Sequence, residues 1–301
     1  MRKVKIVISV LLIAVFVALN GSCLVARELN ADSVFRIKMK NSDELYPAWS
    51  ADGTRLVFQS NRYGNNDIFL YDFLKDTVLR LTNGKADEQH PVFMPESNSV
   101  AFDSRIGNKV YLFKIDTVTG RKDVLFTRKL FCEAPSFSPS GRLVVFKGYD
   151  RNSETWQIFS YDFVYDNLNR LTHYTGKKVS APVFSPNGKV ILFGLQDKEP
   201  PYKRSMEEIN WYGERVCHLD SVQGSSYCWS DAGFRIIYSD KQPDSVFRLL
   251  SVRSDGTSTY ILLDDRFPKF SPALSPDGSK LAVAVKFEND FDIVIIKVTD
   301  E

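Results

Sequence analysis

One segment recurs six times along this 301-residue chain at nearly constant spacing. The copies begin at residues 46, 90, 134, 181, 226 and 271, so they lie 44, 44, 47, 45 and 45 residues apart. Self-similarity at a period of about 40–50 residues is typical of arrays in which each repeat is one supersecondary unit that buries its apolar face against its neighbours. The repeat therefore predicts six similar units rather than a fold with one continuous core.

Each copy has the chemistry of two strands joined by a tight turn. The turns at 138–141, 185–188 and 275–278 read Ser-Pro-x-Gly, in which Ser accepts a backbone hydrogen bond, Pro restricts φ and Gly allows a left-handed conformation. The second strand ends on an aromatic residue in five copies, at Phe58, Phe102, Phe146, Phe193 and Tyr238. Large side chains at one register predict interlocking between neighbouring units.

Two further strands complete each copy, for example DIFLYDF from Asp67 and, in the fourth copy, EINWY from Glu208. Four short strands per repeat are typical of a propeller blade. The sixth copy ends after its third strand, at Val298, whereas the segment 33–39 is a strand without a partner of its own. We therefore predict a six-bladed all-β propeller of four-stranded antiparallel blades over residues 33–298, closed by the N-terminal strand.

The segment from Ser50 to Phe73 resembles the repeat of TolB-type propellers, which runs Ser-Pro-Asp-Gly, an apolar strand, then Ser-x-Arg-x-Gly-x-x-Asp-Ile-Tyr. The resemblance extends over residues 33–298. It implies the propeller and an exported, cell-envelope setting. TolB itself carries an α/β domain before its propeller, for which we expect no room in this chain.

The N-terminus is typical of a secretory signal peptide, because Arg2, Lys3 and Lys5 precede an apolar run from Ile6 to Leu19. Ordinary cleavage after Ala26 would give a soluble exported protein. Cys23 follows Gly21 and Ser22 and resembles a lipidated lipoprotein cysteine, in which case the signal would end at residue 22. We expect export to a bacterial periplasm or attachment to a membrane through a lipid at Cys23.

The charge balance argues against nucleic acid as a partner, and the cysteines give no sign of a disulfide. Without the three basic residues of the signal, 36 basic residues balance 37 acidic ones, so no electrostatic footprint for nucleic acid is present. Cys132, Cys217 and Cys228 are an odd set, and the blade assignment places Cys217 and Cys228 too far apart for a disulfide. We expect buried, unpaired thiols and a monomeric propeller.

No catalytic or metal-binding motif is evident. The chain lacks a Gly-x-Ser-x-Gly elbow, a Cys-x-x-Cys pair and a His-Glu-x-x-His helix. His90 begins an inner strand, whereas His173 follows an outer strand and His218 lies within one, so the three should not converge on a metal. We expect no catalytic residue, cofactor or metal.

The channel mouth is the best candidate for a binding site, since the first strand of each blade lines the channel. Residues at the start of these strands include three carboxylates and a histidine from consecutive blades. The candidates are Glu44, Tyr46, Glu88, His90, Glu133 and Lys269. They predict an acidic, one-sided mouth for a cation, an amine or a basic peptide, unless they are ordinary solvated loop ends.

The leading interpretation is a noncatalytic propeller that binds an envelope protein or peptide. One alternative is a propeller enzyme, such as a glycan lyase or glycosidase, with its site at the channel mouth. Another is a surface carbohydrate-binding or adhesion protein, which exposed aromatics such as Tyr202 and Tyr212 on one face would favour. A charged insertion between Gly194 and Glu208 could contact a partner or be a tolerated loop.

Overall fold

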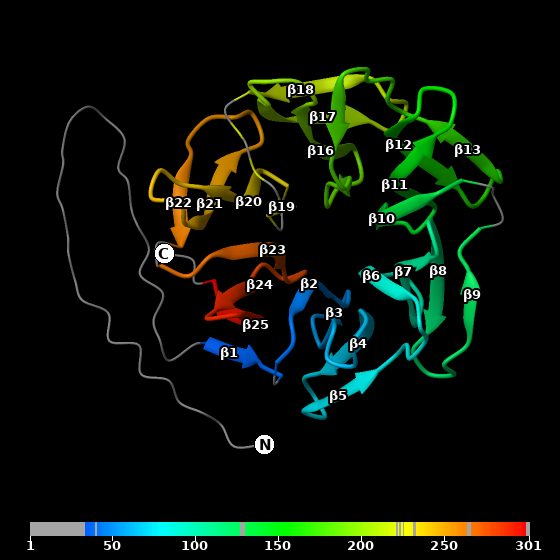
Figure 1. The fold of residues 1–301 in the computed structure, drawn as a ribbon, viewed down its shortest axis with the longest axis vertical. Helices are drawn as coiled ribbons and strands as arrows, with labels where there is room; N and C mark the ends of the chain where they lie inside the picture. Colours follow the sequence, from blue (N-terminus) through cyan, green and yellow to red (C-terminus); the bar gives the residue numbers. More distant parts are fainter. Residues whose placement is uncertain are drawn as a thin grey trace.

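The structure, a computed structural model, describes residues 34–39, 41–126, 130–220, 222, 224, 226–230, 233–263 and 266–298. Every regular element in these ranges is a β-strand, and they contain no helix with the length and apolar character needed to cross a membrane. The strands form six antiparallel blades around a central opening (Figure 1). The predicted six-bladed propeller is confirmed. The predicted signal peptide and Cys23 lie outside the described residues.

The first three blades each consist of four strands that run outward from the channel in chain order. Blade one comprises β2 (Glu44–Trp49), β3 (Arg55–Ser60), β4 (Asp67–Asp72) and β5 (Thr77–Arg80). Blade two comprises β6 (Asp87–Phe93), β7 (Ser99–Ile106), β8 (Lys109–Asp116) and β9 (Lys122–Val124). Blade three comprises β10 (Cys132–Phe137), β11 (Leu143–Asp150), β12 (Thr155–Asp162) and β13 (Asn167–Arg170).

The last three blades follow the same plan with two variations. Blade four comprises β14 (Lys177–Val179), β15 (Val183–Phe184), β16 (Val190–Asp197), β17 (Arg204–Asn210) and β18 (Arg215–Leu219). Its inner strand is split, since β14 and β15 both pair with β16. Blade five comprises β19 (Ser226–Trp229), β20 (Arg235–Lys241), β21 (Phe247–Arg253) and β22 (Tyr260–Leu263). Blade six comprises β23 (Lys269–Leu274), β24 (Lys280–Phe287), β25 (Asp290–Lys297) and β1 (Val34–Ile37).

The ring is closed by β1, which lies beside β25 in Figure 1. The two strands pair antiparallel from Val34 opposite Ile296 to Ile37 opposite Ile293. Arg36 also forms an ion pair with Asp292. The chain thus removes the open edge of its last blade with a strand from its own N-terminal side, as predicted.

The core consists of six apolar clusters, each of which joins two neighbouring blades. In one of them, Ala101 and Leu112 of blade two pack with Phe146 of blade three. The recurrent aromatic residues from Phe58 to Tyr238 are all almost fully buried. The predicted interlocking of blades is therefore confirmed, because each blade buries its faces only against its neighbours.

Blade four differs from the predicted strand boundaries. Its third strand begins at Arg204 rather than Glu208, so about half of the expected insertion is strand and only residues 198–203 connect β16 to β17. Trp211 and Tyr212 therefore lie in the turn after the strand instead of ending it. Tyr202 and Tyr212 flank opposite ends of β17, so they lie on opposite faces of the ring and not on one adhesive face.

Candidate functional site: the central channel

The inner strands that line the channel are bent at one repeat position in four blades. Tyr46, His90, Ala134 and Ser271 have φ angles between 49° and 55°, and each precedes a proline. Strand pairing shifts register across this position in all four blades, which marks a β-bulge. A left-handed residue other than glycine costs about 1–3 kcal/mol, so the surrounding structure imposes this geometry. The bulge re-aims the side chains that it carries.

Two predicted residues and one unpredicted residue form the centre of the site. The rings of Tyr46 and His90 meet edge to face with their centroids 4.4 Å apart. His90 Nδ1 lies 2.7 Å from Oδ1 of Asp103 on β7. The same Oδ1 accepts the backbone N–H of Ala134 at 3.1 Å. Asp103 therefore orients the imidazole and joins blade two to blade three, while the His90 ring contacts Tyr46 of blade one.

A second charged pair extends this surface into blade three. Glu133, on β10, accepts a hydrogen bond from Nζ of Lys147, on β11. The Lys147 ammonium also lies 5.2 Å from the centroid of the Trp156 ring. The predicted carboxylate at Glu133 is thus half-buried and neutralised by a neighbour within its own blade.

The two pairs change the titration of the groups between them. Burial is the main cause that raises the pKa of Tyr46, and the nearby carboxylates of Asp103 and Glu133 raise it further. Burial opposes the charged form of His90, but the Asp103 carboxylate and its hydrogen bond outweigh it and raise the pKa of the imidazole. A neutral phenol beside an imidazole that readily gains a proton can bind polar groups or exchange protons with them.

The other three predicted residues are buried within their own blades. Glu44 accepts hydrogen bonds from Ser42 and Ser60 at 2.7 and 2.8 Å, and Glu88 pairs with Lys122. Lys269 donates from Nζ to the carbonyl of Phe267 at 2.8 Å. The structure brings Tyr46, His90 and Glu133 together and places Glu44, Glu88 and Lys269 inside the blades.

Asp103 and Lys147 were missed by sequence reasoning, although a signal for them exists. Both directly follow the repeat aromatic, at Phe102 and Phe146. The corresponding residues around the ring are Gln59, Asp103, Lys147, Gly194, Ser239 and Ala284. This position is polar in blades one to three and small in blades four to six. The concentration of polar side chains on one side of the channel could therefore have been found in the second strand as well as the first.

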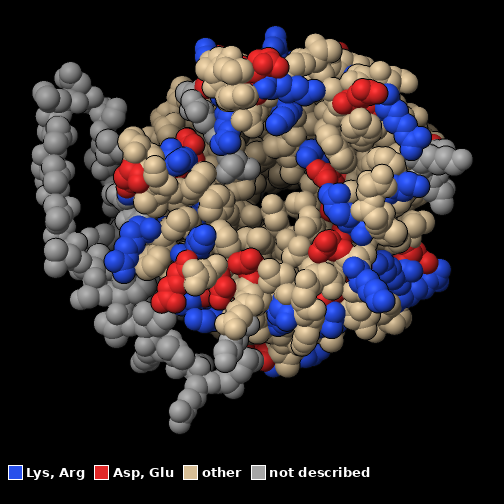
Figure 2. Space-filling view, in the orientation of Figure 1, with Lys and Arg blue, Asp and Glu red and all other residues tan. Residues whose placement is uncertain are grey.

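On the opposite side of the channel, hydrogen bonds between uncharged groups join blades four and five. Tyr227 of blade five donates its hydroxyl to the carbonyl of Ala181 at 2.5 Å and accepts the N–H of Gly194 at 2.9 Å. A Cβ at Gly194 would lie 2.8 Å from Oγ of Ser180, so a larger residue would not fit there. Figure 2 shows the resulting asymmetry, with acidic and basic side chains along the side of the opening where β6 and β10 lie.

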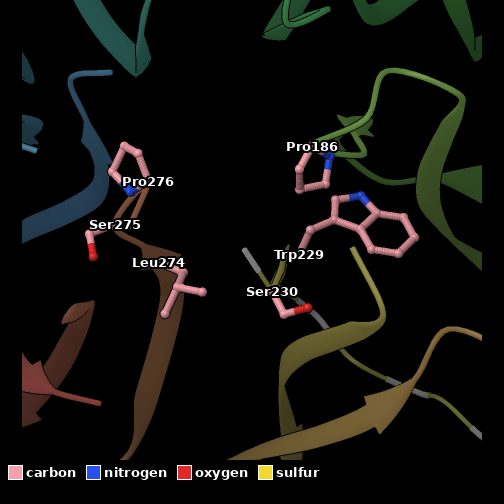
Figure 3. A pocket seen from close by; sticks show the side chains of 6 residues that line it. All are labelled: Pro186, Trp229, Ser230, Leu274, Ser275 and Pro276. Atoms are coloured by element: carbon pink, nitrogen blue, oxygen red, sulfur yellow. The ribbon is translucent and has the colours of Figure 1, made fainter. Parts of the chain in front are cut away.

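The opposite mouth of the channel, formed by the turns between first and second strands, contains a small pocket of about 230 Å³. Trp229 and Pro186 lie on one side of it, and Leu274 and Pro276 face them from the other (Figure 3). Ser230 and Ser275 supply its polar atoms. Its walls suit an apolar side chain of a partner rather than a charged ligand.

The three histidines do not converge. His90 lies on the inner strand β6 of blade two, whereas His218 lies on the outer strand β18 of blade four, where it is bonded to Glu207 and Asp220 at 2.9 and 2.8 Å. Among the described residues, no group of three or more His, Cys, Asp or Glu side chains has the geometry of a metal site. Cys132, Cys217 and Cys228 are unpaired.

The repeat and the channel can be compared with known proteins. Residues 16–233 match the family model for the TolB beta propeller domain. The chain therefore belongs to the TolB beta-propeller family. The match covers more than half of the chain and includes the polar side of the channel.

Curated relatives of this TolB-family chain are themselves TolB proteins. A Protein TolB homolog of Chlorobium chlorochromatii is 34% identical over 144 residues, which cover 48% of this chain and 32% of the relative. The Tol-Pal system protein TolB of Francisella tularensis is 25% identical over 240 residues, which cover 62% of this chain and 54% of the relative. The chain thus spans about half, or less, of the length of these relatives.

Solved structures share the fold at low identity. A putative TolB from Agrobacterium tumefaciens has a TM-score of 0.63 and 18% identity, covering 85% of this chain and 91% of its own. Oligogalacturonate lyase from Vibrio parahaemolyticus has a TM-score of 0.60 and 15% identity, covering 89% and 94%. At such identity these likenesses support the fold and nothing more specific.

Proposed function

We propose that this chain is an exported, noncatalytic propeller that binds a protein or peptide of the bacterial cell envelope through its channel. The observation that carries the proposal is the polar surface that blades one to three contribute to the channel, formed by Tyr46, His90, Asp103, Glu133 and Lys147. The residue that follows the repeat aromatic is small in blades four to six. Membership of the TolB family supports a role among envelope proteins.

The pairing of the charges favours a polar segment over a simple cation. Each carboxylate of this surface already has a cationic or potentially cationic neighbour, so a metal ion or an amine would have to displace one. A peptide offers both donors and acceptors, and it can also stack on Tyr46, a residue that remains 38% exposed. The ligand of this site is therefore proposed to be a polar peptide segment.

Site-specific photocrosslinking in the native envelope tests this proposal. A photoreactive phenylalanine analogue at Tyr46 should capture one predominant partner, which mass spectrometry would identify. The matched control carries the same analogue at Val216, an exposed residue of the outer strand β18. Capture at Tyr46 should be lost when His90 and Asp103 are both replaced by alanine. Equal labelling at both positions, or none at Tyr46, would refute channel binding.

A second candidate is favoured by one observation. An imidazole oriented by a carboxylate beside a tyrosine is an arrangement suited to general acid–base chemistry. Oligogalacturonate lyases share the fold. Incubation with oligogalacturonate should then give the ultraviolet absorbance of an unsaturated uronate, and His90→Ala should abolish it. No absorbance change with the unaltered protein removes this candidate.

Export and anchoring are part of the same proposal. The chain is proposed to reach the periplasm through its N-terminal signal, with Cys23 as the lipidated residue when a lipoprotein signal peptidase processes it. Metabolic labelling with a fatty-acid analogue should mark the protein, and Cys23→Ala should remove the label while export continues. Labelling that survives in Cys23→Ala excludes this anchor.

A further inference from the structure

The turns between the third and fourth strands share one construction in blades one to four. In each, a polar side chain that ends the third strand accepts two backbone N–H groups of the turn. Asp72 binds the N–H groups of Leu74 and Lys75, both at 3.0 Å. Asp116, Asp162 and Asn210 bind their turns in the same way, at distances between 2.7 and 3.2 Å. The residue that ends the third strand therefore holds each turn in one conformation.

This construction projects apolar side chains into solvent. The residues at the tips are Leu74, Val118, Val164, Tyr165, Trp211 and Tyr212. All but Trp211, which is 42% exposed, are between 67% and 81% exposed. Blade five lacks such a tip, since its turn reads Ser254-Asp255-Gly256. Apolar tips in four consecutive blades make a repeated feature rather than scattered surface residues.

All these tips lie on one face of the ring. Strands alternate in direction within a blade, so third-to-fourth turns lie at the same end as first-to-second turns. Backbone hydrogen bonds join the two kinds of turn directly, from Phe73 to Thr54, Thr117 to Asn98 and Phe163 to Arg142. We call this side, with the tips of blades one to four, the turn face. Its tips follow the outer rim of the disc from β4–β5 to β17–β18 (Figure 1).

Five carboxylates of the turn face are engaged within their own turns. Asp72, Asp116 and Asp162 bind backbone, and Asp76 and Asp166 accept the hydroxyls of Tyr71 and Tyr161. Two further carboxylates on this face, Glu96 and Glu214, are exposed. Five basic side chains lie beside the tips, and within the described residues four of them, all but Lys189, also form an ion pair with a nearby carboxylate. They are Lys75, Arg121, Arg142, Lys189 and Arg215. Arg142 is held by Asp162 and lies 4.9 Å from the Tyr165 ring, so cation and aromatic ring form one unit.

We propose that the turn face binds an anionic membrane surface. Tips spread around four blades of a flat disc can all be immersed together only by a broad planar partner. Tyrosine, tryptophan and short apolar side chains flanked by Lys and Arg are the residues that favour the boundary between lipid headgroups and acyl chains. The opposite channel mouth, with Tyr46 and His90, would remain free, so the inference does not depend on which partner the channel binds.

Binding to vesicles tests the inference. The full chain is mixed with vesicles of phosphatidylethanolamine and phosphatidylglycerol, and with phosphatidylcholine vesicles as the neutral comparison. In the turn-face variant Leu74, Val118, Tyr165 and Tyr212 are all replaced by serine. In the control variant, Ile106 at the end of β7 and Tyr202 in the β16–β17 connection are replaced by serine; both are exposed and lie on the opposite face. All three proteins share the same N-terminal segment, so differences report on the faces alone.

We expect the turn-face variant to lose affinity for anionic vesicles by about tenfold or more, with the control unchanged and binding weakened by salt. Equal partition of the two variants overturns the inference, as does a turn face that captures an envelope protein while vesicle binding stays the same. A second measurement needs only the native fold: brominated acyl chains should quench Trp211, and the quenching should disappear in Trp211→Phe. Quenching that is the same in Trp211→Phe also overturns the inference.

Discussion

At the scale of single residues, Asp103 organises the polar side of the channel. One oxygen of its carboxylate serves both His90 and the backbone of Ala134, so the side chain fixes an imidazole and a neighbouring blade together. The residue is nearly buried, which makes both hydrogen bonds hard to replace with water. Removal of Asp103 should therefore change the pKa of His90 and the stability of the fold, in addition to any effect on ligand binding.

We expect the imidazole of His90 to titrate above the usual value for histidine of about 6.5, because Asp103 stabilises its charged form. Asp103→Asn should lower this pKa, since burial then dominates. The pair's contribution to stability is present below about pH 6.5 and is lost as the pH rises through the raised pKa. Proton NMR checks this, because the chain has 3 histidines and few imidazole signals. The His173 signal is the internal control, and an unchanged His90 titration in Asp103→Asn would contradict the prediction.

Glu208 gives the opposite sign of pH dependence. It is 5% exposed on β17, on the same face as Met206, and among the described residues no donor reaches its Oε1. Burial raises its pKa from 4.5 to about 7. The unfolded chain ionises at the lower value, so the free energy of unfolding should fall between these two pH values by about 3 kcal/mol and stay lower above them.

Glu208→Gln should remove that slope and raise the free energy of unfolding above neutral pH by about 1–3 kcal/mol, since a buried neutral amide costs less than a carboxylate. Urea unfolding at an acidic and an alkaline pH measures both effects. Glu199→Gln, at an exposed carboxylate of the β16–β17 connection, is the control and should change little. A pH slope that persists in Glu208→Gln would mean that another group causes it.

At the scale of elements, β17 shows why the fourth blade was harder to predict. Its first four residues, Arg204 to Glu207, contain charges that resemble a loop, yet they pair with β16 along their length. The buried charge of Glu207 is stabilised because Tyr174, His218 and Arg215 surround it. These partners come from other strands and from blade three, so sequence patterns within one strand could not reveal them.

The β17–β18 turn also contacts the preceding blade, and this contact is testable. Gly213 has a φ of 90°, and a Cβ there would lie 2.5 Å from the carbonyl oxygen of Leu171. Gly213→Ala should lower the free energy of unfolding by about 2–4 kcal/mol, from backbone strain and the clash together. Gly176→Ala is the matched control, since Gly176 has a φ of 71° but open space around it. Equal losses for the two variants would show that the contact with blade three does not contribute to the free energy of unfolding.

At the scale of the whole molecule, stability depends on closure of the ring. Each of the six apolar clusters joins two blades, so no blade has a complete core of its own. The cluster between blades six and one includes Ile37 of β1 with Phe58 and Ile293. The short strand that closes the ring therefore contributes to packing as well as to strand pairing.

Ile37→Ala should lower the free energy of unfolding by about 2–4 kcal/mol, because it leaves a cavity where the ring closes. Lys38→Ala, at the exposed residue next in the chain, should have little effect. Urea unfolding, monitored by tryptophan fluorescence, gives both values. Light scattering would show whether the protein associates with other molecules when β1 no longer covers the edge of the last blade. Matching stabilities for the two variants would mean that β1 adds no packing energy.

The sequence by itself determined the architecture of this protein. Repeat length, turn residues and recurrent aromatics depend on local geometry and on packing that is the same in every blade. One chain read alone therefore predicts six blades and their closure by the segment 33–39, in which the structure forms the strand Val34–Ile37. Only the tertiary structure decided the site. Burial of Glu44 and Glu88, the pairing of His90 with Asp103 and the sorting of tips onto one face depend on bulges and on neighbours brought together from different strands. The contacts of Glu44, Glu88 and His90 join different strands of one blade, and the repeat period does not show which side chains meet there.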